Sequence, residues 1–196
     1  MGLGPWSPTQ LRDKLTGKVM ALTVDMGTYA ETVSGSSTPQ DLESLLQLLQ
    51  LHFQPARVDT ALFKAYLQRA QDAARNNAEQ PDAQFAQAVN DSLFGNHPRA
   101  PEVVTPALLA SIDMERTVAI YNERFGSAQG FDFVFVGNVD LDATKALVEQ
   151  YIATLPTGAI EHQAKDLGIR PVMAQRDIRV AKATEPKATA TLTYAG

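Results

Sequence analysis

The chain has 196 residues, of which 44% are hydrophobic and 20% are charged, and its formal net charge is -5. The acidic balance argues against a nucleic-acid-binding protein, because phosphate recognition needs a basic face. No apolar run approaches the roughly 20 residues that a membrane helix requires. The absence of cysteine excludes disulfides, thiolate zinc sites and cysteine nucleophiles. A soluble chain of this length forms one large domain, or one domain with a piece of another.

The first quarter of the chain predicts a helix, a hairpin and a second helix. Ser7 and Pro8 mark a helix start, because serine caps helices and proline suits their first position. Residues 18–25 and 28–34 are predicted as the two strands of a hairpin. Residues 41–54 repeat leucine at three- and four-residue spacing, which is typical of an amphipathic helix.

Helices dominate the middle of the chain. The sequence predicts a long helix from about residue 59 to residue 79 and another at 82–95. Two shorter helices are expected at 106–112 and 113–125. Residues 96–106, which separate the helix at 82–95 from these two, are predicted to be an irregular loop, because this stretch has no helical periodicity and contains three prolines.

The clearest local pattern lies in residues 131–156. Residues 131–136 are mostly aromatic and β-branched and therefore predict a strand, and Gly137–Asn138 predicts a turn. Asp140 then stands at the N-cap of a helix that Leu155–Pro156 ends.

The composition changes beyond Pro156. Residues 157–175 lack periodicity and contain glycine and proline, as linkers do. Residues 176–182 and 188–195 alternate as two further strands. Strands and helices are therefore segregated along the chain, which favours the α+β class over alternating βαβ units.

In this order, the segments resemble the insulinase/pitrilysin-type zinc metallopeptidases, the inverzincins. That family carries a strand ending in Val-Gly-Asn/Asp-Val/Phe-Asp and a helix ending in Tyr-hydrophobic-x-x-Leu-Pro, as residues 136–140 and 151–156 do here. Further matching positions are Gly2, Gly4, Leu11, Leu15, Gly17, Lys18, Gly35–Ser37, Asp41–Glu43, His97, Pro98, Tyr121, Asn122, Arg124 and Phe125. The match covers about residues 2–158 and looks like the family's third homologous domain.

The resemblance implies a two-layer sandwich, with a mostly antiparallel sheet and helices packed on one face. It implies that residues 1–158 are a non-catalytic domain truncated at its N-terminal strand, that 159–175 are a linker, and that 176–196 are the first strands of a following homologous domain. The N-terminus lacks the features of a signal peptide, and we expect the natural protein to extend upstream. Four such domains form the two halves of a hollow clamp in the family, and the first domain carries zinc.

The family's zinc motif, H-x-x-E-H on a helix with a later glutamate, is absent from the sequence. Its spacing places two imidazoles on one helical face, and the intervening glutamate polarises a zinc-bound water. His52, His97 and His162 are too far apart for such pairing, and Glu161–His162 imitates only half the motif, with Gly158 at the first ligand position. A zinc site built from the scattered histidines remains an alternative. Positions at a helix end, in a loop and in a linker are favoured, so no catalytic or metal residue is assigned.

Other polar positions favour structural roles. Ser34–Ser37 have no G-x-S-x-G context and predict a turn with helix capping. Gly2-x-Gly4 and Gly137–Asn138 do not continue as phosphate-binding loops. Asp140 and Asp142 suggest a metal site, but an N-cap at Asp140 is favoured.

Substrate-binding residues stay unassigned. Arg69 and Arg75 are expected on a solvated helical face. Arg99 stays open as a binding residue, because long loops often carry function, although a surface arginine is favoured. The family's substrate-gripping arginine and tyrosine lie in its fourth domain, and Tyr194 stands in only the first strands of that domain.

These observations predict a non-catalytic part of an insulinase/pitrilysin-like peptidase that helps enclose a peptide and is inactive by itself. Zinc and the catalytic base are expected in another domain of the parent protein. The alternatives are an inactive scaffold or assembly subunit of the same family and, from a different class, a free-standing peptide-binding or dimerisation module.

The expected partners are a peptide or protein substrate, the catalytic half of the same protein, and a second copy of the chain through strand exchange. Strand exchange is expected because the missing first strand leaves a sheet edge to which the trailing strands can add. A periplasmic or secreted location is favoured by the absent cysteines and the resemblance to secreted bacterial members, with the cytoplasm as the alternative.

Overall fold

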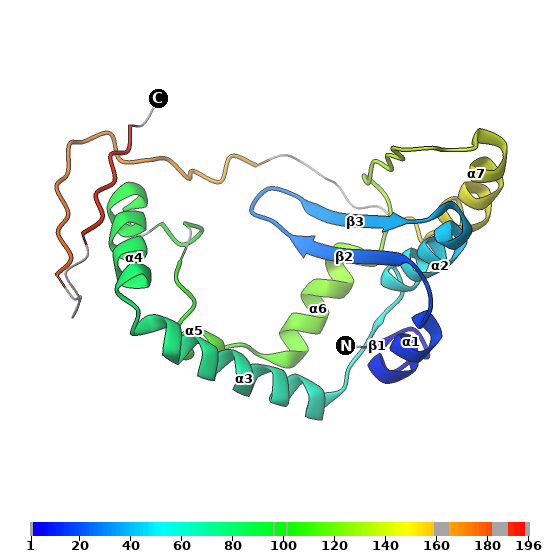
Figure 1. Ribbon diagram of the computed structural model, residues 1–196, viewed down its shortest axis with the longest axis horizontal. Coiled ribbons are helices and arrows are strands. Elements are labelled where there is room, and N and C mark those ends of the chain that lie inside the picture. Colours follow the sequence, from blue (N-terminus) through cyan, green and yellow to red (C-terminus); the bar gives the residue numbers. More distant parts are fainter. Residues whose placement is uncertain (1, 96, 101, 159–164, 182–187, 195–196) are drawn as a thin grey trace. The chain divides into compact units, whose positions relative to one another are not determined.

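The computed structural model describes residues 2–95, 97–100, 102–158, 165–181 and 188–194 (Figure 1). The chain divides into two compact units, one formed by Met1–Phe63 with Asp113–Gln163 and the other by Lys64–Ile112 with Ala164–Gly196. Helices and antiparallel strands are segregated rather than alternating, so the predicted α+β class is confirmed.

A β-hairpin is the central sheet element of the first unit. Strand β2 (Met20–Met26) pairs antiparallel with β3 (Glu31–Ser37), and Val24 lies opposite Val33. The Gly27 amide donates to the Ala30 carbonyl at 3.0 Å and closes the turn. The turn therefore lies further along the chain than predicted, and both strands are displaced toward the C-terminus.

The hairpin leads directly into the first long helix of this unit. A 3₁₀ turn, η1 (Pro39–Asp41), precedes α2 (Leu42–His52). The Asp41 carboxylate accepts a hydrogen bond from the Val19 amide at 2.9 Å and pairs with Lys18 at 3.2 Å. The Val19 hydrogen bond and then the Lys18 contact lower the pKa of Asp41. This side chain therefore joins the start of α2 to the start of the hairpin.

The core of the first unit forms where α2 meets the helix near residue 150. Helix α7 (Leu141–Leu147) continues as a π-helical turn, η2 (Val148–Ile152). The buried side chains of this core are Leu46, Leu49, Phe53, Tyr151 and Leu155. Burying an aliphatic or aromatic side chain contributes about 1.5–3 kcal/mol, so this cluster is the main source of cohesion between the two helices.

Two further helices and a short ladder complete the first unit. Helix α1 (Pro8–Leu15) begins with a capping box in which Ser7 and Gln10 bond each other's backbone amides. Strand β1 (Gly2–Leu3) pairs antiparallel with β4 (Ala56–Arg57). Strands of two residues are too short for a sequence pattern to predict them. Helix α6 (Met114–Phe125) begins at its predicted cap, since Asp113 accepts from the Arg116 amide at 2.7 Å.

The second unit contains the middle helices. Helix α3 (Thr60–Ala78) begins in the first unit and continues into the second, which also holds α4 (Pro81–Phe94) and α5 (Pro106–Ala110). The Gln87 side chain accepts from the Val103 amide at 2.7 Å, and the Leu93 carbonyl accepts from the Val172 amide at 2.7 Å. Both flanking segments are thus fastened to α4.

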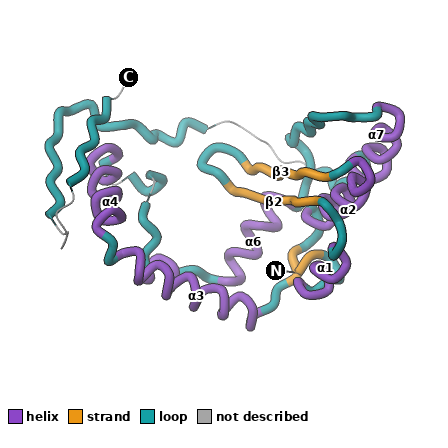
Figure 2. The backbone as a smooth tube through the Cα atoms, in the orientation of Figure 1, coloured by secondary structure: helices purple, strands orange, loops and turns teal. Residues whose placement is uncertain are grey.

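Three predicted strands are not strands in the structure. Residues 131–136, and the described parts of 176–182 and 188–195, pair with no other described strand (Figure 2). Alternating side chains give a segment a tendency to extend, but a strand forms only when its N–H and C=O groups find a neighbouring strand. The prediction of paired strands is therefore wrong for the described residues of these three segments.

Replacing Phe53 with alanine should destabilise the protein strongly. Phe53 is 1% exposed and meets Phe131 edge to face at 5.3 Å, so truncation leaves a cavity that the surrounding helices cannot fill. The free energy of unfolding, measured by urea titration, should fall by about 3–5 kcal/mol. Leu62→Ala is the control, because that side chain is 47% exposed; it should change the same quantity by less than about 0.5 kcal/mol. Equal losses in both variants would contradict the assigned core.

The last residue of α2 is held by a tyrosine of α6. Tyr121 donates its hydroxyl to the His52 carbonyl at 3.0 Å, and the hydroxyl oxygen lies 2.9 Å from His52 Nδ1. This geometry suits the neutral imidazole with its proton on Nδ1. Burial lowers the pKa of His52 to about 4 and raises the pKa of Tyr121 to about 12.

The buried histidine should make stability depend on pH. Between about pH 6.5 and pH 4 the unfolded chain takes up a proton at His52 that the folded chain does not, so stability falls as the pH falls. We expect a loss of about 1–2 kcal/mol over this window, allowing for the partial exposure of the ring. Urea titrations at several pH values measure it. His52→Gln should remove this part of the pH dependence and His97→Gln should keep it; the reverse result would show that another group is responsible.

Candidate functional site

The structure gives the histidines separate settings. His52 ends α2 in the first unit, where Tyr121 holds it. His97 follows α4 in the second unit, and its Nδ1 accepts from the Arg99 amide at 3.2 Å. His162 lies outside the described residues, as does Glu161. Within the described ranges no group of three or more histidine, aspartate and glutamate side chains gathers to hold a metal ion. We therefore assign no chemical step to zinc here.

The polar residues near the hairpin and α7 have structural roles. Ser34–Ser37 lie within β3, so the predicted turn at this position is wrong. Gly35 faces α2, since a Cβ atom on it would lie 3.1 Å from the Leu45 methyl groups. Asp140 accepts from the Ala143 amide at 3.0 Å and forms the predicted N-cap. The small side chain at position 35 lets the hairpin approach α2 closely.

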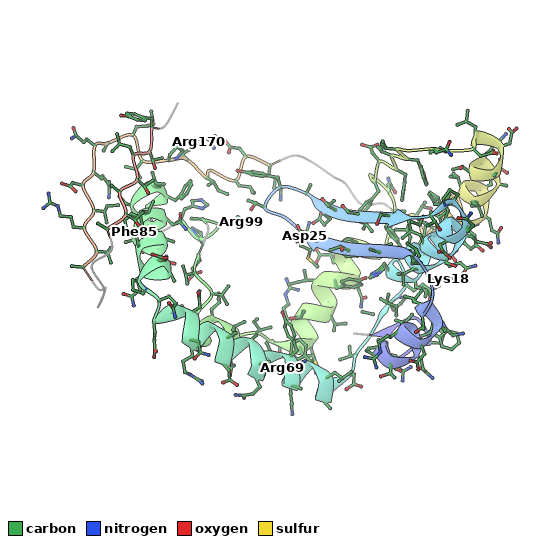
Figure 3. The ribbon with its side chains drawn as sticks, viewed as in Figure 1. Lys18, Asp25, Arg69, Phe85, Arg99 and Arg170 are labelled. Carbon is green, nitrogen blue, oxygen red and sulfur yellow. The ribbon has the colours of Figure 1, made fainter. Side chains whose placement is uncertain are left out.

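The arginines lie on exposed surfaces of the chain. Arg69 and Arg75 are on α3, where Arg69 donates to the Ala65 carbonyl and Arg75 pairs with Asp72 at 3.0 Å. Arg99 is exposed on the loop after α4, and Figure 3 labels it there. None of these three arginines lines the cavity described next.

A groove of about 1220 Å³ opens in the first unit and is the strongest candidate for a binding surface. One wall is β3, the opposite wall is the extended segment at residues 131–136, and α2 and α7 form the floor (Figure 1). The floor is apolar, with Leu42, Leu45 and Leu46 from α2 and Leu147 from α7. Lysine, arginine and histidine are missing from the described residues that line it.

The groove has a chemical character that suits polypeptide backbone. Both walls present extended chain whose N–H and C=O groups can pair with a third strand, and the floor offers apolar side chains. The charged lining residues are acidic, and Glu31 is already paired with Arg124 at 3.4 Å. Sequence reasoning did not locate this groove, although the strand-like pattern at 131–136 was its one visible signal.

In the described part of the chain, no helix is both long enough and apolar enough to cross a membrane.

Comparison with known proteins finds no family model that matches the chain. A probable zinc protease PqqL from Haemophilus influenzae is 27% identical over 124 residues, which are 62% of this chain and 13% of that protein. The crystal structure of the periplasmic protease PqqL from Escherichia coli superposes with a TM-score of 0.74 at 17% identity, covering 94% of this chain and 20% of that one. The ferredoxin protease FusC, in complex with Arabidopsis ferredoxin, superposes with a TM-score of 0.63 at 19% identity, covering 83% and 18%.

The chain thus spans about one eighth of the curated relative and about one fifth of the solved proteases. Its fold is that of a part of these proteases, and its sequence is similar to a part of one of them. These findings confirm, over part of its length, the resemblance of this chain to the insulinase/pitrilysin-type zinc proteases.

Proposed function

We propose that this chain is a non-catalytic part of an insulinase/pitrilysin-type zinc protease and helps to enclose a protein or peptide substrate. Zinc and the catalytic base are supplied by another part of the parent protein. The observation that carries the proposal is a superposition over 94% of the chain on one fifth of a periplasmic protease, combined with a sequence that lacks H-x-x-E-H.

The fold supports an enclosing role rather than a chemical one. The described residues offer an apolar core and a groove whose charged lining residues are acidic, and no metal-binding group gathers among them. Such a part contributes to catalysis by geometry: it forms a wall of a chamber and excludes water while other residues act. The assignment to the third homologous domain is part of this proposal.

The substrate class and compartment follow from the relatives. FusC is described in complex with a whole protein, ferredoxin, and PqqL of Escherichia coli is described as periplasmic. By analogy we assign a protein or peptide substrate and the periplasm to the parent of this chain, an inference that rests on fold-level likeness.

The first test is a metal and activity measurement on the purified chain. It should contain no stoichiometric zinc by elemental analysis and should not cleave an unstructured protein such as casein. The full-length parent is the matched control: its gene should encode H-x-x-E-H and a later glutamate upstream of Gly2, and its cleavage of casein should stop with a chelator.

Two results would contradict the proposal in different ways. Chelator-sensitive cleavage by the 196-residue chain alone would show that it carries its own active site. A parent without the zinc motif would instead favour an inactive scaffold or assembly subunit of the family.

A further inference from the structure

Two segments that line the groove, β3 and residues 131–136, have backbone edges without a ladder partner among the described residues. β3 pairs with β2 along one edge only, and residues 131–136 have no ladder partner among the described residues.

The groove also specifies which side chains an added strand must carry. Its floor is made by leucines of α2 and α7, so every second side chain of the strand should be apolar. The other face of the sheet is solvated, because Thr32, Ser34 and Ser36 of β3 are exposed. Since the groove is lined by acidic but not by basic residues, an acidic strand is disfavoured.

One described segment of this chain meets these requirements. Residues 188–194 are extended and exposed, they carry no charge, and they are as long as β3. Ala188, Ala190, Leu192 and Tyr194 alternate with three threonines. Leu192 is 79% exposed and Tyr194 is 84% exposed, so the apolar face of the segment is free to bury itself.

The other trailing segment is a poorer fit. Residues 176–181 contain Arg176, Asp177 and Arg179, and an acidic and a basic side chain there pair at 3.5 Å. The apolar side chains of this segment, Ile178 and Val180, are already half-buried. Residues 188–194 therefore remain as the strand that this chain can donate.

We propose that residues 188–194 of a second copy of this chain insert between β3 and residues 131–136, and that two copies exchange these strands reciprocally. The donor segment belongs to the second compact unit and the groove to the first. The Val172–Leu93 hydrogen bond at 2.7 Å fastens the chain leading to the strand to α4. A reciprocal exchange is closed by a two-fold axis and fills both grooves.

The chain contains no cysteine, so any disulfide that forms must join the cysteines introduced for the test. Ser34 of β3 points away from α2, and a neighbouring strand would bring an outward-facing Cβ within about 4.5–5.5 Å. A chain carrying Ser34→Cys is mixed under mild oxidation with one carrying Thr189→Cys, Thr191→Cys or Thr193→Cys, which cover the alternative registers. At least one mixture should give a disulfide-linked heterodimer, and a chain with Gln175→Cys, outside the strand, should not.

A matched pair of lysine variants tests the same contact without cross-linking. Leu192→Lys puts a charge over the apolar floor, and Thr191→Lys puts the same charge on the solvated face of the same strand. By sedimentation equilibrium, the unaltered chain should dimerise, Leu192→Lys should raise the dimer Kd at least about tenfold, and Thr191→Lys should change it little.

Several outcomes would overturn the proposal. The proposal is wrong if the chain is a monomer at all concentrations. It is also wrong if the dimer is equally insensitive to Leu192→Lys and Thr191→Lys, or if a dimer forms but no cysteine mixture cross-links. An intramolecular disulfide in a chain that carries both cysteines would show that the strand folds into its own groove instead of a second copy's. These results are independent of zinc and peptidase assays, so the exchange can hold or fail whatever the parent protein does.

Discussion

Phe53, at the end of α2, holds the first unit together. Its side chain is 1% exposed, lies among the buried leucines of α2 and meets Phe131 edge to face at 5.3 Å. Phe131 in turn packs near Phe125 of α6, with ring centroids 6.2 Å apart. These two aromatic contacts therefore join the end of α2 to the end of α6 and to the segment that follows α6. Because the hydrophobic effect is nondirectional, the polar contacts around this core fix its geometry.

Those polar contacts lie along the edge of the same interface. Tyr151 donates its hydroxyl to Glu43 at 2.7 Å and accepts from Gln47 at 2.9 Å, and Gln50 donates to Thr154 at 3.1 Å. Side chains one and two turns apart on α2 thus engage η2 and the turn that follows it. They set the helices in register, while the leucines beneath supply most of the stabilisation. The groove depends on this arrangement, since α2 and α7 are its floor.

The comparisons tie the fold to a part of larger zinc proteases, and His52 and His97 contact Tyr121 and the Arg99 amide. Under the proposed function the chain acts through shape, by presenting walls, grooves and strand edges. An unpaired strand edge beside an apolar floor can also bind the backbone of many sequences.

Local sequence determined the helices, because capping and periodicity are short-range properties. Asp113, Asp140 and Ser7 cap as predicted, and the helices predicted from leucine spacing begin and end within a few residues of their expected places. The resemblance to a zinc protease family was also visible in short motifs. The sequence did not locate the groove or the His52–Tyr121 contact, and it overstated the strands. Those features depend on residues 69 positions apart or more. A strand-like segment becomes a strand only when tertiary structure brings it a partner, and residues 131–136 pair with no described strand.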